Sequence, residues 1–108
     1  AWLEGKAKLP GGDTSFDAIP AMVQAGKILW VTVLFEDASS DVADASDTAG
    51  WYASFPNDKV AVIADDDRKM YDYLFPGGYP SIHVLNEDMT FRSYDRFDFA
   101  PALQSLLP

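Results

Sequence analysis

The side chains that could act as nucleophiles in this sequence are hydroxyls, because the chain of 108 residues contains no cysteine. Ser39 and Ser40 lie in a polar stretch, EDASSD, that follows an apolar segment. A serine nucleophile needs a base within hydrogen-bond reach, usually a histidine. The one histidine, His83, falls in the middle of an expected strand, where a hydrogen-bonded structural role is typical. The sequence therefore does not support serine hydrolysis, and we assign no catalytic residue.

Acidic residues outnumber basic ones, with 17 Asp and Glu against 8 Lys and Arg and a net charge of −9. The acids between residues 37 and 47 and the run 65–67 do not follow the D-x-[DN]-x-[DN]-G spacing of a calcium-binding loop. The pair Gly77 and Gly78 precedes a proline and a strand rather than a helix amino terminus, so it does not indicate a phosphate loop. We expect no metal and no cofactor.

The composition also limits the partners. A chain without a cluster of Lys and Arg residues is not expected to bind nucleic acid or anionic membranes. The longest apolar run, residues 28–35, is too short to span a bilayer, so no membrane insertion is expected. An apolar content of 48% with 14% aromatic residues indicates a folded domain whose aromatic side chains fill a core or form a contact surface.

The first elements are an extension, a helix and a strand. Residues 1–13 end in Pro-Gly-Gly and are interpreted as an N-terminal extension before one domain over residues 14–108. A helix is expected over residues 14–25, where apolar side chains recur at helical spacing. Residues 27–35 are almost all apolar and often β-branched, which is typical of a strand that is covered on both faces.

A second helix is expected after the EDASSD stretch. Ser40 or Asp41 can cap it, and it runs to about Phe55. Trp51 lies within this helix and suits either a core position or a surface contact. Its inward stripe is expected to consist of Val42, Ala45, Ala49 and Tyr52.

The remaining pattern predicts a buried strand over residues 59–65, then a short helix that includes Tyr73 on its packed side. Two strands over residues 80–85 and 89–94 are joined as a hairpin, and a last helix starts near Asp98. The order of elements is α-β-α-β-α-β-β-α. Such alternation indicates the α/β class, with a mixed central sheet and helices on both faces.

With Pro80 at the mouth of the hairpin, this order resembles the thioredoxin-like superfamily. The stretch SFDAIPAMVQAGKILWVTVLF is similar to the opening helix and central strand of thioredoxins. The stretch GGYPSIHVLNEDMTF is similar to the loop, cis-proline and hairpin that follow. The resemblance covers about residues 14–107. It implies a thioredoxin-like fold with a mixed central sheet, a C-terminal β-hairpin and a final helix.

Two alignments to that superfamily remain open. In the first, the strand over 27–35 leads to the position of the redox motif, and residues 38–41 stand near the cysteine positions. In the second, the chain resembles the redoxin branch, that is, TlpA- and ResA-like thiol-disulfide oxidoreductases and their peroxiredoxin relatives. The helix over 14–25 would then correspond to the cysteine-bearing helix, and the first strand and its CxxC would lie upstream of Ala1. In both alignments this chain carries no redox thiol.

The resemblance implies a module without redox activity that binds a protein or an extended peptide on its cis-proline face, or serves as a structural subunit. In this superfamily, substrate peptides pair with the backbone beside the cis-proline. The expected binding residues are Tyr79, Pro80, Ser81, Ala38, Ser39, Ser40, Asp41 and Trp51.

Two alternative functions are kept. In one, the chain is the C-terminal part, or a cysteine-less form, of a redoxin-type thiol-disulfide oxidoreductase or peroxidase. In the other, it is an acidic subunit of a larger assembly that makes contact through exposed aromatic residues. An extracytoplasmic location, periplasmic or secreted, is expected from the resemblance alone.

Overall fold

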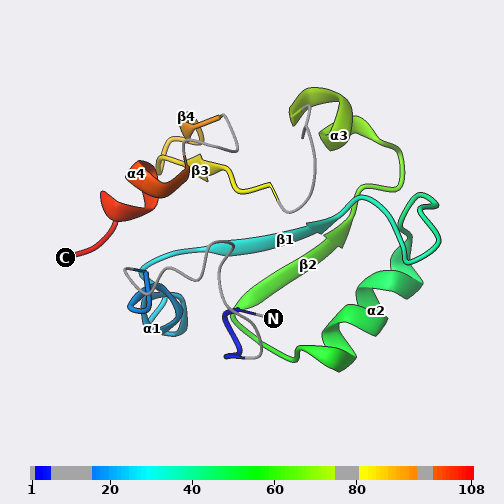
Figure 1. The fold of residues 1–108 in the computed structure, drawn as a ribbon, viewed down its shortest axis with the longest axis horizontal. Helices are drawn as coiled ribbons and strands as arrows, with labels where there is room; N and C mark the ends of the chain where they lie inside the picture. The colour runs from blue at the N-terminus through cyan, green and yellow to red at the C-terminus, as the bar shows by residue number, and fades with distance from the viewer. Residues whose placement is uncertain (1, 6–15, 75–80, 95–98) are drawn as a thin grey trace.

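The computed structural model describes residues 2–5, 16–74, 81–94 and 99–108. They form a mixed α/β fold with helices and small sheets (Figure 1). In chain order the elements are α1 (Ile19–Gln24), β1 (Trp30–Leu34), α2 (Ala45–Ser54), β2 (Val60–Ala64), α3 (Lys69–Leu74), β3 (Val84–Leu85), β4 (Phe91–Ser93) and α4 (Phe99–Gln104).

Helix α1 is shorter than the expected 14–25, and proline explains where it begins. Pro20 occupies its first turn, where the missing N–H is not needed. The helix ends before Gly26, whose φ of 72° is the left-handed conformation that favours glycine. The predicted stripe is confirmed, because Phe16, Ile19 and Val23 are all buried.

Strands β1 and β2 pair in parallel, with Trp30 opposite Val60 and Leu34 opposite Ala64. On one face of this sheet Trp30 and Val60 belong to the core. On the other face Val31 and Ile63 are exposed. The prediction of a strand covered on both faces is therefore wrong, because the described helices leave one side of this two-stranded sheet open.

Helix α2 begins later than expected and is capped by a different residue. The carboxylate of Asp44 accepts hydrogen bonds from the backbone N–H groups of Ser46 and Asp47, and the Asp47 carboxylate accepts one from the Asp44 N–H at 2.8 Å. This reciprocal capping box fixes the start of the helix at Ala45. The expected cap at Ser40 or Asp41 was wrong. The expected inward stripe was also wrong, because its members are exposed: Val42, Ala45, Ala49 and Tyr52.

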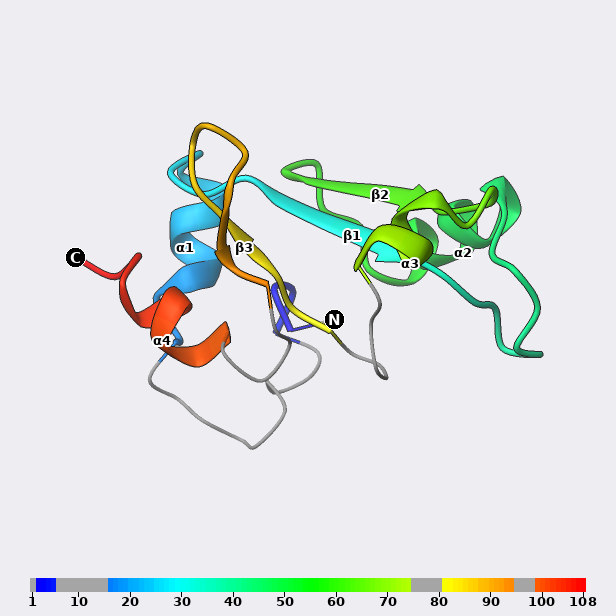
Figure 2. The ribbon, with the colours of Figure 1, turned by 90° about the horizontal axis from the view of Figure 1, so that it is seen from above.

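Strands β3 and β4 form an antiparallel hairpin with a bulge between Val84 and Leu85. The expected single mixed sheet is not observed, since the described strands form two separate two-stranded sheets. Helix α4 packs on the hairpin through buried Ala102 and Leu103. Figure 2 shows α1, the hairpin and α4 gathered around one end of β1, and α2 and α3 toward the other.

One hydrophobic core holds the two sheets together. Its buried members come from α1 and the turn before it, from both sheets and from α4: Phe16, Ile19, Val23, Val60, Val84, Ala102 and Leu103. Trp2 packs on Trp30, with ring centroids 5.7 Å apart, so the amino-terminal residues dock on β1. Burial of this shared cluster supplies the main stabilisation that two small sheets lack on their own.

Candidate functional site

The predicted binding residues 38–41 lie in a closed loop after β1. An isolated antiparallel bridge between Glu36 and Val42 joins the two ends of the loop. Inside it, the Asp37 carboxylate accepts hydrogen bonds from the backbone N–H groups of Ser39 at 2.8 Å and Asp41 at 2.9 Å. Ser40 has a φ of 65°, in the left-handed region. The Asp37 side chain thus holds the loop in one shape and leaves the Ser39 side chain exposed.

A second polar junction ties the carboxyl ends of β1 and β2 together. The buried Asp65 carboxylate accepts hydrogen bonds from the backbone N–H groups of Met70 at 2.9 Å and Tyr71 at 2.7 Å, at the start of α3. The Arg68 guanidinium donates to the carbonyl of Phe35 at 3.2 Å and lies 3.9 Å from the centroid of the Tyr71 ring. These contacts secure the start of α3 against the end of β1.

Trp51, the last predicted contact residue of the amino-terminal half, is half-buried on α2. Its ring packs on Phe55, with centroids 4.9 Å apart and planes tilted by 56°. The pair lies on the same helix, at the spacing of neighbours four residues apart. Trp51 therefore takes part in local packing at the end of α2.

Ser81 is the described member of the predicted cis-proline face, because Tyr79 and Pro80 lie outside the described residues. The Ser81 hydroxyl and His83 Nε2 are 2.9 Å apart and share a hydrogen bond. His83 Nδ1 is buried and has no hydrogen-bond partner within the described part of the chain. No acid therefore orients this ring there as one does in a hydrolase triad. His83 has the hydrogen-bonded role expected from the sequence.

Next to Ser81, the outer face of the hairpin carries a cluster that we call the hairpin patch: Tyr73, His83, Leu85, Phe91 and Tyr94. The Tyr73 ring from α3 stacks on Phe91 with centroids 6.3 Å apart and planes 23° apart. The Tyr94 ring meets Phe91 edge-on at 5.0 Å, and His83 lies within 6.1 Å of Phe91. The Tyr94 hydroxyl donates to the Tyr73 carbonyl at 3.0 Å, which holds the helix and the hairpin together.

The hairpin patch is accessible although its rings contact one another. Tyr73 is 69% exposed, and Tyr94 is 45% exposed. Within the hairpin, the paired residues Val84 and Ser93 are buried, whereas Leu85, the partner of Phe91, is exposed. The irregular register between these two pairs interrupts regular strand alternation. Exposed apolar clusters of this kind are typical of contact surfaces.

The predicted site residues do not form one surface. Figures 1 and 2 place the 36–41 loop beyond the carboxyl end of β1 and the β3–β4 hairpin near its other end. Ser81 adjoins the hairpin patch, whereas residues 38–41 belong to the distant loop. The sequence pattern did not predict that Tyr73, Phe91 and Tyr94 would form a surface cluster. The high aromatic share was the available signal, but short strands give too little alternation to show which rings face outward.

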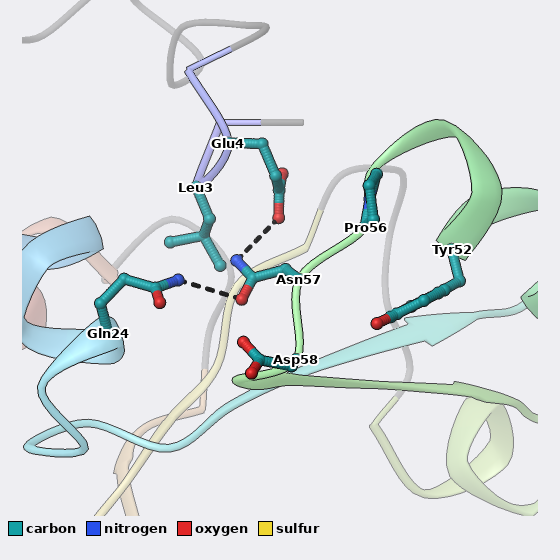
Figure 3. A pocket seen from close by; sticks show the side chains of 7 residues that line it. All are labelled: Leu3, Glu4, Gln24, Tyr52, Pro56, Asn57 and Asp58. Atoms are coloured by element: carbon teal, nitrogen blue, oxygen red, sulfur yellow. Dashed lines mark hydrogen bonds between the residues drawn. The ribbon is translucent and has the colours of Figure 1, made fainter.

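An open hollow lies between the amino-terminal residues and the ends of α1 and α2 (Figure 3). The buried Asn57 amide donates to Glu4 Oε1 at 3.1 Å and accepts from Gln24 Nε2 at 3.0 Å and from the Lys59 N–H. Burial raises the pKa of Glu4, but hydrogen bonds that include the one from Asn57 outweigh it and lower that pKa. Both the oxygen and the nitrogen of the Asn57 amide are therefore hydrogen-bonded, and they link the amino-terminal residues, α1 and the segment before β2.

The described residues contain no group of three or more His, Asp or Glu side chains placed to hold a metal ion. None of the described helices is long and apolar enough to cross a membrane. In comparisons with known proteins, no family model, no curated protein and no solved structure matches this chain.

Proposed function

We propose that this chain is a thioredoxin-like module without thiol chemistry that binds protein partners through the hairpin patch. The observation that carries the proposal is the exposed pair of tyrosines, Tyr73 and Tyr94, whose rings both contact Phe91. Tyrosine offers a large contact area with few rotatable bonds, and it is enriched among the residues that dominate binding energy.

The thioredoxin-like part of the proposal is supported by the order of elements. A parallel β1–α2–β2 unit is followed by a helix, an antiparallel hairpin and a final helix. A chain with no cysteine has no thiol to exchange with a disulfide. We therefore expect no reduction of insulin disulfides by this chain alone. The same resemblance leads us to propose an extracytoplasmic location.

An extended peptide is the kind of partner that suits this surface. Within the described residues, β3 pairs in a sheet with β4, and we propose that the other edge of β3 accepts a further strand. A peptide that adds to such an edge gains main-chain hydrogen bonds, and alternate side chains contact one face of the sheet. Those side chains would meet the hairpin patch, beside Ser81.

The test is binding to an array of extended peptides of varied sequence. For peptides that bind, the double variant Tyr73→Ser/Tyr94→Ser is expected to lose at least about tenfold in affinity, since two exposed aromatic contacts are removed. The matched control is Leu29→Ser, because Leu29 is 83% exposed and lies outside the hairpin patch. Binding that survives the double variant, or that Leu29→Ser weakens equally, would show that the hairpin patch is not the contact surface.

A further inference from the structure

The charges around the hairpin patch are predominantly negative. Asp72 precedes Tyr73 on α3 and is exposed, and Glu87 and Asp88 are exposed in the hairpin turn. A hydrogen bond from the Thr90 hydroxyl, and another from its backbone N–H, lower the pKa of Asp88. Its carboxylate therefore keeps its charge over the whole physiological range.

The nearest described basic side chains are directed to other partners. Arg92 donates to Asn86 Oδ1 at 2.8 Å and to the Ser105 hydroxyl at 3.0 Å. Lys69 pairs with Asp67 at 3.1 Å. Arg68 is engaged with Phe35 and Tyr71. In the described part of the chain, these three cations are thus engaged away from the tyrosine rings of the hairpin patch.

The two tyrosines of the hairpin patch offer aromatic rings to a cation. Tyr73 stacks on Phe91 with centroids 6.3 Å apart and is still 69% exposed. Tyr94 meets Phe91 edge-on and lies 5.9 Å from His83, and it is 45% exposed. Both tyrosine side chains are therefore accessible to a partner. The face of a tyrosine ring attracts ammonium and guanidinium groups, Arg most often.

We propose that the hairpin patch selects a basic segment of its partner, an extended peptide with an Arg or Lys side chain over the Tyr73 or Tyr94 ring and near Asp72. This inference rests on the proposed function and names the partner's chemistry. The net charge of −9 favours the same partner, since a negative protein attracts basic peptides and repels acidic ones.

The experiment measures fluorescence anisotropy with a labelled probe, Ac-Gly-Arg-Val-Arg-Val-Arg-Gly-NH2. Two matched probes carry Gln or Glu in place of every Arg. The Arg probe is expected to bind at least about tenfold more tightly than the Gln probe, and the Glu probe more weakly than both. Raising the salt to about 1 M is expected to reduce this difference, because it screens exposed charges.

Two variants distinguish the contribution of the Tyr73 ring to binding from that of the Asp72 charge. Tyr73→Leu keeps an apolar side chain but removes the ring face, and is expected to weaken the Arg probe about two- to fivefold with little effect on the Gln probe. Asp72→Asn is expected to weaken the Arg probe by a similar factor. Asp17→Asn is the control, because Asp17 is exposed, lies before α1 and changes the net charge equally. Circular dichroism of each variant verifies the fold.

The outcomes distinguish the two proposals. If all probes bind equally and the tyrosine double variant abolishes binding, the hairpin patch binds peptides but does not select basic ones, and this inference is overturned. If Asp17→Asn weakens the Arg probe as much as Asp72→Asn does, the attraction is a property of the whole surface, which also overturns it. If no probe and no array peptide binds, the proposed function fails as well.

Discussion

The clearest stability prediction compares two aliphatic side chains that the sequence alone does not distinguish. Ile19 is 0% exposed and lies in the core cluster, whereas Leu29 is 83% exposed just before β1. Ile19→Ala removes three buried carbon groups at about 0.8 kcal/mol each, or about 2.4 kcal/mol. The cavity left behind adds to this, so we expect a loss of about 3–4 kcal/mol in the free energy of unfolding. Leu29→Ala is expected to change it by less than about 0.5 kcal/mol.

Urea unfolding followed by circular dichroism measures both effects. With a denaturant dependence of about 1–3 kcal/mol per molar urea, the Ile19→Ala midpoint is expected to fall by about 1–4 M, with an unchanged slope. Equal losses for the two variants would contradict the reasoning, because they would mean that Leu29 is as buried as Ile19. A loss below about 1 kcal/mol for Ile19→Ala would likewise show that α1 does not pack against the two sheets.

Three further stability predictions follow from local geometry. Hydrogen bonds, the largest from the Ser46 hydroxyl, lower the pKa of Asp44 below its ordinary value of 3.8. The charged form therefore stabilises the fold above that pH, and this contribution is lost as the pH falls through the lowered pKa. The stability difference between the parent chain and Asp44→Asn should shrink when urea titrations are repeated at acid pH. Met89 has a φ of 68°, so Met89→Gly is expected to raise the free energy of unfolding by up to about 1 kcal/mol, and with it the urea midpoint; a lower midpoint would contradict this. Asn57→Ala removes the acceptor of the Gln24 side-chain hydrogen bond, so we expect a loss of about 1–3 kcal/mol in the free energy of unfolding, measured by thermal unfolding. A neutral result would show that the amide is dispensable.

The α/β class and the alternation of elements were predictable from the sequence, because the apolar periodicities are strong where burial is deep. The stripe of α1 at Ile19 and Val23 is the best example, since both residues are buried as its spacing predicts. The parallel pairing of β1 and β2 follows from a helix placed between two apolar runs.

Helix α2 shows where periodicity fails. Its apolar residues repeat at helical spacing, but none of its residues is buried, because α2 packs at the margin of the fold. Its start was misplaced because Asp41 and Asp44 are equally good caps by residue type. Only the reciprocal bond from Asp47 selects Asp44.

The candidate site was only partly predictable. Ser81 was identified through its place beside Pro80, and the structure adds His83 as its hydrogen-bond partner. Tyr73 was expected to be packed, yet it is one of the most exposed apolar residues described. Its surroundings depend on how α3 meets the hairpin, a long-range arrangement that local sequence patterns do not encode.

Binding at the hairpin patch can be located by titrating the ¹⁵N-labelled chain with a peptide that binds it and following the amide chemical shifts. The largest changes are expected on α3 and on residues 81–94, around Tyr73, His83 and Phe91. Amides of the 36–41 loop should change little, because that loop lies far from the β3–β4 hairpin (Figure 1). Changes concentrated on residues 36–41, with the hairpin unaffected, would instead assign binding to the loop after β1.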